Sequence, residues 1–284
     1  MTTLYQLPSP FPTEWGTLLL LESPDADAAT LRQQLLDESY TKPFVVDDGS
    51  CRYLYFNVRL MQSAMRIKAP DDLELRYTQQ MMAALLFCPR PRRILLIGLG
   101  GGSLTKFCYR RLPGAHCCVI ELDPDVIALR DVFMLPGDDD RLQVVAGDGR
   151  EHLAEVAEGI DLLLVDAFNA EGVAPGFADR AFVERAYAKL SNQGVLVMNL
   201  AGERHSYEGL IHEVLTVFDD RTLLLPVPED GNHILFAFRD PAFAPRWRWL
   251  HNHARELRAK HGLDFPRFAQ QLERAARQDQ PRRW

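Results

Sequence analysis

The fold is decided by residues 93–104, Arg-Ile-Leu-Leu-Ile-Gly-Leu-Gly-Gly-Gly-Ser-Leu, where an apolar run leads directly into a glycine loop. Ile94–Ile97 has the length of a buried strand, and an amphipathic stretch follows the loop. Gly98, Gly100 and Gly102 allow a tight turn and let a ligand approach the backbone closely. The helix that begins here also offers amide groups without intrahelical partners. This context predicts a nucleoside-binding α/β domain, with a tight turn that binds no ligand as the alternative.

The alternation of strand and helix continues to about residue 200. The strand-like runs are Ile94–Ile97, Cys117–Ile120, Leu142–Val145, Leu162–Val165 and Val195–Met198, and the amphipathic stretches between them are 102–111, 124–130, 150–157 and 179–190. Such alternation is typical of βαβ units around a parallel sheet that is buried on both faces. Thr222–Val227 and His233–Phe238 follow a helix near 207–217 without a helix between them, which predicts an antiparallel edge pair. We therefore predict an α/β, methyltransferase-like Rossmann fold with a mainly parallel seven-stranded sheet and a closing antiparallel edge hairpin.

The residues before this alternation predict a small N-terminal β-domain. Phe44–Val46 and Cys51–Phe56 flank an Asp-Asp-Gly-Ser turn, which indicates a β-hairpin, and Met61–Ile67 extends it. Helices are expected at 28–36 and at 73–87, the second ending before Pro89.

The C-terminal tail is rich in arginine and tryptophan, as in Arg246-Trp247-Arg248-Trp249. We favour a solvated helix pair whose tryptophans pack against the core. A nucleic-acid or partner surface is the alternative, supported only by local charge. The expected division is residues 1–70 for the N-terminal segment and β-domain, 71–240 for the Rossmann domain and 241–284 for the helical tail.

The composition of the whole chain narrows the functional classes. The 284 residues are 47% hydrophobic and 25% charged, ordinary values for a globular protein. A formal net charge of −7 argues against nucleic acid as a partner. No apolar run approaches the roughly 20 residues that span a bilayer, so no membrane association is expected. The five cysteines include no CxxC pair, so the expected location is the reducing cytoplasm, and the eight histidines show no metal-binding spacing. Cys117 and Cys118 are expected to fill space on opposite faces of one strand.

Glu121 follows the second parallel strand, about 20 residues past the glycines. A carboxylate at that place accepts hydrogen bonds from the hydroxyl groups of a ribose. Asp123 precedes Pro124 and is expected instead to cap the next helix. Glu121 is therefore the predicted nucleoside ligand.

Two further aspartates follow the next two strands, at the same edge of the predicted sheet. Asp148, before Gly149, suits either an adenine amino group or the cap of the helix at 150–157, and its spacing alone does not decide between them. Asp166 precedes a loop with glycine and proline that resembles a lid, and we expect it to face the substrate. An aspartate that only orders the loop is the alternative.

At this point the chain resembles the spermidine synthase family of aminopropyltransferases over residues 44 to about 200. The resemblance is carried by Gln62-Ser63, Tyr77 within Arg76–Met82, residues 97–104, Glu121-Leu122-Asp123, Gly147-Asp148-Gly149 and Asp166. It implies transfer of an aminopropyl group from decarboxylated S-adenosylmethionine to a di- or polyamine, and a homodimer formed through the β-domain. It also implies catalytic roles for Asp166 and Tyr77 beside the amine, and cofactor contacts from Gln62, Gly98, Gly100, Gly102, Glu121, Asp148 and Gly149.

Two positions depart from the family pattern. Gly101 and Asn169 stand where the family carries aspartates, and Asn169 is still expected to bind substrate. Each missing carboxylate removes a charge-assisted hydrogen bond worth about 1.5–3 kcal/mol where desolvated. Two alternatives therefore stay open: a methyltransferase that uses intact S-adenosylmethionine, and a nucleoside-binding homologue without aminopropyl transfer.

Overall fold

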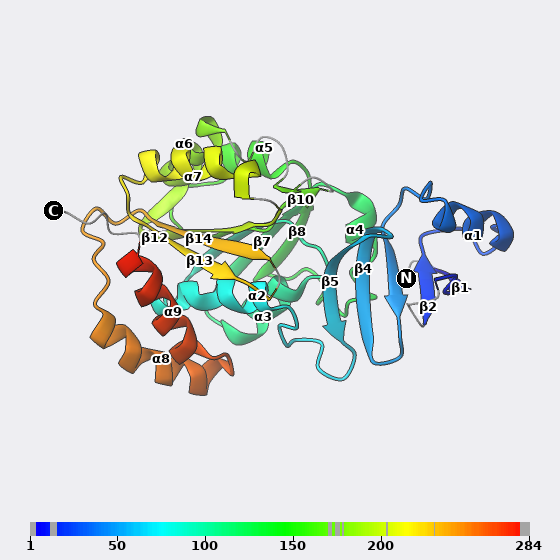
Figure 1. Cartoon of the computed structure of the whole chain (residues 1–284), viewed down its shortest axis with the longest axis horizontal. Helices are drawn as coiled ribbons and strands as arrows, with labels where there is room; N and C mark the ends of the chain where they lie inside the picture. Colours follow the sequence, from blue (N-terminus) through cyan, green and yellow to red (C-terminus); the bar gives the residue numbers. More distant parts are fainter. Residues whose placement is uncertain are drawn as a thin grey trace.

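A computed structural model shows a seven-stranded sheet and a smaller N-terminal sheet (Figure 1). The structure describes residues 4–11, 16–169, 172–173, 177, 179–202, 204–229 and 231–278. The large sheet has the order β13-β14-β12-β9-β6-β7-β8. Its strands are β6 (Arg93–Ile97), β7 (His116–Glu121), β8 (Leu142–Ala146), β9 (Ile160–Val165), β12 (Leu190–Leu200), β13 (Thr222–Val227) and β14 (Asn232–Phe238). The pairs from β12 through β8 are parallel, whereas β14 pairs antiparallel with β12 and β13, which confirms the predicted fold.

Helices cover both faces of this sheet (Figure 1). One face carries α5 (Gly149–Glu155), α6 (Arg180–Lys189) and α7 (Glu208–Val217), and the other carries α2 (Arg76–Met81), the 3₁₀ helix η1 (Met82–Leu86), α3 (Ser103–Arg111), α8 (Trp247–His261) and α9 (Phe265–Gln278). Because successive strand residues point to opposite faces, the core forms two clusters. Cys117 belongs to one cluster and Cys118 packs against the other, as predicted. The helix expected at 73–87 is split, and all of η1 is buried.

The C-terminal helix pair packs against the core beneath η1 and β13, and its prediction is confirmed in part. Trp247 packs against this cluster, but Trp249 is 53% exposed and stacks on His253 one turn further along α8. The expectation that both tryptophans pack against the core was wrong, because residues two apart on a helix face different sides.

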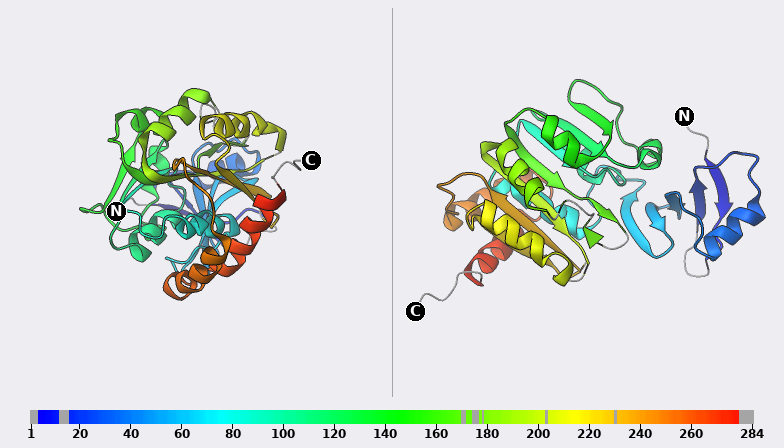
Figure 2. Two further views of the ribbon diagram at one scale, coloured as in Figure 1. Left: turned by 90° about the vertical axis from the view of Figure 1, so that its left-hand side faces the viewer. Right: turned by 90° about the horizontal axis from the view of Figure 1, so that it is seen from above.

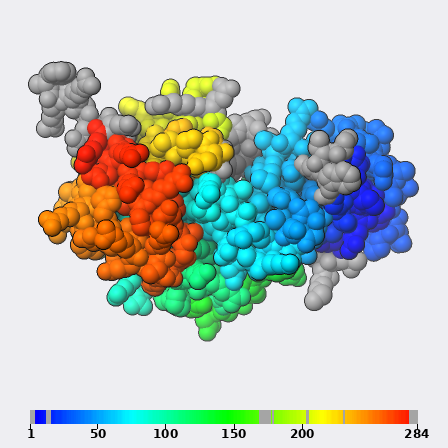
Figure 3. Space-filling view, turned by 60° about the horizontal axis from the view of Figure 1, so that its bottom comes forward, coloured from blue at the N-terminus to red at the C-terminus, as the bar shows by residue number. Residues whose placement is uncertain are grey.

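The N-terminal sheet is an antiparallel meander of five strands with its own small core. Its strands are β1 (Tyr5–Pro8), β2 (Thr17–Leu20), β3 (Phe44–Asp47), β4 (Cys51–Asn57) and β5 (Leu60–Arg66), and α1 (Ala28–Leu36) is capped by Asp27. The predicted hairpin and third strand are confirmed, whereas β1 and β2 were missed because four residues carry too little periodicity. Figure 2 shows this sheet at one end of the molecule, and Figure 3 shows the C-terminal helices at the other.

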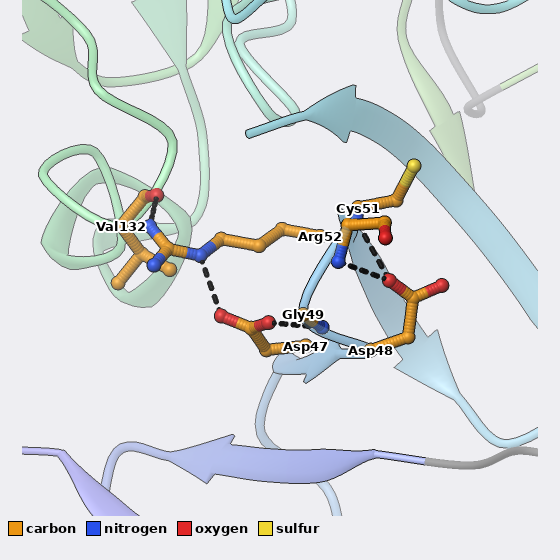
Figure 4. A network of polar contacts seen from close by, with 7 residues as sticks. Asp47, Asp48, Gly49, Cys51, Arg52 and Val132 are labelled. Atoms are coloured by element: carbon orange, nitrogen blue, oxygen red, sulfur yellow. Dashed lines mark hydrogen bonds and ion pairs between the residues drawn. The ribbon is translucent and has the colours of Figure 1, made fainter. Parts of the chain in front are cut away.

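Two cations, one from the N-terminal sheet and one from α3, hold the segment that follows α4 (Pro124–Ala128). Arg52 in β4 donates from Nη1 to the carbonyl oxygen of Val132 and from Nε to Asp47, 2.8 Å away (Figure 4). Lys106 in α3 is completely buried and donates to the carbonyl oxygen of Phe133 at 2.7 Å. Burial lowers the pKa of Lys106 to about 8. The consecutive carbonyl groups of Val132 and Phe133 are thus held from two sides, and the ring of Phe133 lies next to Gly101 of the glycine loop.

Within the described ranges, no helix combines the length and the apolar character needed to cross a membrane.

Candidate functional site

A cavity of about 320 Å³ lies where β5 and α2 meet the carboxyl ends of β6, β7 and β9. Its size is within the range of small-molecule sites. Eight of the predicted site residues line it: Gln62, Tyr77, Gly98, Gly100, Glu121, Asp148, Gly149 and Asp166. Residues from both sheets therefore meet at one site.

The glycine loop brings β6 close to the end of β9. Gly98 has φ +96°, and a Cβ there would lie 2.2 Å from the carbonyl oxygen of Asp166. Only glycine fits at this position. Gly102 lies outside the cavity wall; it precedes α3 with φ +69° and is adjacent to Leu135.

Glu121 joins the glycine loop to the end of β7. One carboxylate oxygen accepts from the backbone amide of Leu99 at 2.8 Å, and the other accepts from the backbone amide of Asp123 at 2.9 Å. Only 8% of Glu121 is exposed. A carboxylate has about four acceptor positions, so two remain for ligand hydroxyl groups. Asp123 caps α4 as predicted, with Pro124 in the first turn.

Asp148 caps α5, which confirms the capping interpretation. Its Oδ1 accepts from the backbone amide of Arg150 at 2.8 Å, and the guanidinium of Arg150 also donates to the carboxylate. Hydrogen bonding to Arg150 lowers the pKa of Asp148. An adenine amino group would share this carboxylate with Arg150, and that contact stays a prediction.

Asp166 lies at the end of β9, between groups from two other segments. Tyr77 in α2 donates its hydroxyl to Oδ2 at 3.3 Å, and Asn199 in β12 donates to Oδ1 at 2.9 Å. Burial raises the pKa of Asp166 to about 6, against the opposing effect of the hydrogen bonds from Asn199 and Tyr77. A carboxylate that titrates near neutrality at a cavity is typical of a functional site.

Several wall residues were not predicted: Phe56, Ser63, Thr78, Leu122 and Phe177. Leu122 had a detectable sequence signal, because it is an apolar residue between two acidic ones. In the structure it is 72% exposed. Asn199 was missed because a polar residue within an apolar strand gives no indication of which side chain it contacts. The Asn169 side chain lies outside the described residues. Its backbone forms β10 (Phe168–Asn169), which pairs with β11 (Gly172–Val173), and most of the predicted lid is likewise not described.

Sequence comparison places the chain in a known family. The sequence model of the spermine/spermidine synthase domain matches residues 74–219. A polyamine aminopropyltransferase of Chromobacterium violaceum is 33% identical over 235 residues, which cover 82% of this chain and 90% of that protein. The chain belongs to the spermine/spermidine synthase family.

Solved structures with the same fold come from this family and beyond it. A probable spermidine synthase from Corynebacterium glutamicum has a TM-score of 0.63 at 18% identity, covering 81% of this chain and 91% of that one. Human methyltransferase-like protein 13 has a TM-score of 0.56 at 22% identity, covering 74% of this chain and 95% of that one. At these identities the structures support the fold alone, and the family assignment rests on sequence.

Proposed function

We propose that this protein transfers an aminopropyl group from decarboxylated S-adenosylmethionine to a nitrogen of a di- or polyamine. The observation that carries the proposal is Asp166 with Tyr77 at the wall of a cavity that also contains Glu121, in a chain of this family. Glu121, Gln62, Asp148 and Gly149 would bind the nucleoside, and Asp166 and Tyr77 would bind the attacking amine.

The reaction forms one bond and breaks one. The lone pair of the amine nitrogen forms a bond to the carbon beside the sulfonium, and the C–S electron pair goes to sulfur, which leaves as the thioether methylthioadenosine. The attacking nitrogen becomes positively charged and then releases a proton. Asp166 would orient the amine and stabilise this charge, and its raised pKa brings it closer to proton transfer than an ordinary carboxyl.

The donor is the second part of the proposal, because Gly101 replaces an aspartate of the family pattern. A Cβ on Gly101 would lie 2.6 Å from Ser63 Oγ and 3.0 Å from the ring of Phe133. An acidic side chain therefore does not fit unless its neighbours move. Intact S-adenosylmethionine, whose carboxylate would meet no aspartate at 101, is the second candidate donor.

The two donors are separated by their products. The protein is incubated with decarboxylated or intact S-adenosylmethionine and with a panel of diamines and polyamines. Methylthioadenosine that accumulates only when an amine is present supports aminopropyl transfer. S-adenosylhomocysteine formed from the intact donor would instead assign methyl transfer. Calorimetry with both donors and methylthioadenosine measures binding independently of turnover, and binding without either product would favour the non-catalytic alternative.

A further inference from the structure

A chain of buried amide groups lies behind Asp166. Asn199 donates from Nδ2 to Asp166 Oδ1 at 2.9 Å, and Asn232 donates from Nδ2 to Asn199 Oδ1 at 2.7 Å. Asn199 is 4% exposed and Asn232 is 8% exposed. Neither is among the described residues that line the cavity.

The backbone of the sheet sets this arrangement. Val165 pairs with Met198 across β9 and β12, so the residues that follow them, Asp166 and Asn199, lie side by side. Asn232 begins β14, which runs antiparallel to β12. The hydrogen-bonded series of side chains therefore runs from Asp166 after β9, through Asn199 in β12, to Asn232 in β14 of the edge hairpin.

The order of donors and acceptors in this chain has a direction. The Asn199 side chain can present either its amino group or its oxygen, and an ionised carboxylate only accepts. Because Asn232 donates to the Oδ1 atom of Asn199, the amino group of Asn199 is directed to Asp166. The reversed amide would place two oxygens together at Asp166 and two amino groups together at Asn232.

We propose that Asn199 and Asn232 are positioning residues, which hold the Asp166 carboxylate in its reactive orientation and keep it ionised without contacting substrate. The inference rests on the proposed function through Asp166. The titratable groups that face Asp166 in the described structure are Tyr77 from α2 and Glu121 from β7. His233, next to Asn232, is paired through Nδ1 with the hydroxyl of Tyr207.

The test is a double-mutant cycle of Asn199→Leu and Asn232→Leu, with kcat/KM measured against pH. Loss of a hydrogen bond to a charged group predicts a roughly ten- to hundredfold fall in kcat/KM at neutral pH for Asn199→Leu. The acidic limb of the profile should move to higher pH, because the ionised form loses a donor. Asn232→Leu should move the limb in the same direction by less, and should have no further effect in the Asn199→Leu background.

Ile234→Val is the matched control, since Ile234 is buried in β14 and pairs with Asn199 through backbone register only. It should lower the unfolding temperature and leave the acidic limb in place. If Asn199→Leu does not fold, Asn232→Leu still tests the inference, because Asn232 touches neither Asp166 nor the cavity. An unmoved limb in every folded asparagine variant would overturn the inference.

A direct titration of the Asp166 carboxyl by carbon NMR, in the parent and in each variant, needs no turnover. If the parent shows no transferase activity but the carboxyl titration shifts in the variants, the proposed function fails and the positioning role stands. If the parent is active and the titration does not shift, the positioning role fails alone.

Discussion

Asp166 is buried, and its pKa is affected by Asn199, Tyr77 and Glu121. Burial raises its pKa to about 6, so the carboxylate form falls below half as the pH drops through 6. We expect kcat/KM to fall about tenfold per pH unit below this value, separately from the titration of the amine substrate near pH 10. A pH profile measured with saturating donor tests this. An acidic limb near pH 4 would mean that Asp166 titrates as an ordinary carboxyl.

Asp166→Asn separates activity from stability. The variant keeps the shape and removes the charge, and we expect a loss of about 10²–10⁴-fold in kcat. When the pKa of a carboxyl is higher in the folded than in the unfolded chain, the free energy of unfolding falls as pH rises between the two pKa values. The unfolding temperature at pH 8 should therefore not fall in Asp166→Asn. A large drop in that temperature would indicate that Asp166 stabilises the loop that follows it and does not take part in the reaction.

Gly101 is a glycine because of its neighbours, since its φ is not among the positive values of the loop. Gly101→Asp should destabilise the protein by about 1–3 kcal/mol by overpacking against Ser63 and Phe133. Adding Ser63→Gly removes the two serine contacts and should recover part of the loss. The double variant should also bind decarboxylated S-adenosylmethionine more tightly than Ser63→Gly alone. Urea unfolding and calorimetry check both statements, and equal stability of the two Gly101→Asp proteins would contradict the steric account.

At the scale of elements, Arg52 connects β4 to the segment after α4 (Figure 4). Arg52→Ala should cost about 1–3 kcal/mol of unfolding free energy, because the carbonyl of Val132 and the carboxylate of Asp47 both lose a charged donor. Amide exchange should accelerate across residues 131–136. Arg59→Ala is the matched control, because the Arg59–Glu38 pair is exposed and should contribute less than about 1 kcal/mol. If the two substitutions lowered the free energy of unfolding equally, Arg52 would not be a stabilising connection between β4 and the segment after α4.

The elements differ in how far local pattern predicted them. The parallel strands β6, β7, β9 and β12 were found because strands buried on both faces are continuous apolar runs. β8 lies at the edge of the sheet and is only partly buried, but its sequence is also mostly apolar. The helix at 73–87 changes to a 3₁₀ turn at Met82, where every residue is buried and apolar periodicity gives no boundary. β1 pairs with β2, and β2 pairs with β3, which is information that four-residue segments do not contain.

For the molecule as a whole, His261 connects the C-terminal helices to α3. It is 2% exposed, its ring lies near Phe107 and Phe265, and neither ring nitrogen has a hydrogen-bond partner in the described part of the chain. Burial, with smaller effects of Lys260 and Arg111, lowers its pKa to about 4. In the unfolded chain the histidine has an ordinary pKa near 6.5, so it takes up a proton at a higher pH than in the folded chain. The free energy of unfolding that His261 contributes is therefore lost as pH falls from about 6.5 towards 4. His261→Leu should unfold at a higher temperature than the parent at pH 5, with a smaller difference at pH 8. The same difference at both pH values would show that His261 stays uncharged in the unfolded protein or is not buried in the folded one.

The sequence by itself determined the order along the chain of the seven strands of the large sheet, the glycine loop, and which acidic residues follow which strands. These properties are local, because the side-chain period and the turn residues are set within a few positions along the chain. The division at residues 70 and 240, the roles of the site residues and the homodimer stay predictions. Only the tertiary structure decided that Tyr77, Asp166, Asn199 and Asn232 form one hydrogen-bonded chain, and that Ser63 occupies the space beside Gly101. Each of these contacts depends on how strands distant in sequence lie side by side, and on side-chain distances of about 3 Å that no local pattern encodes.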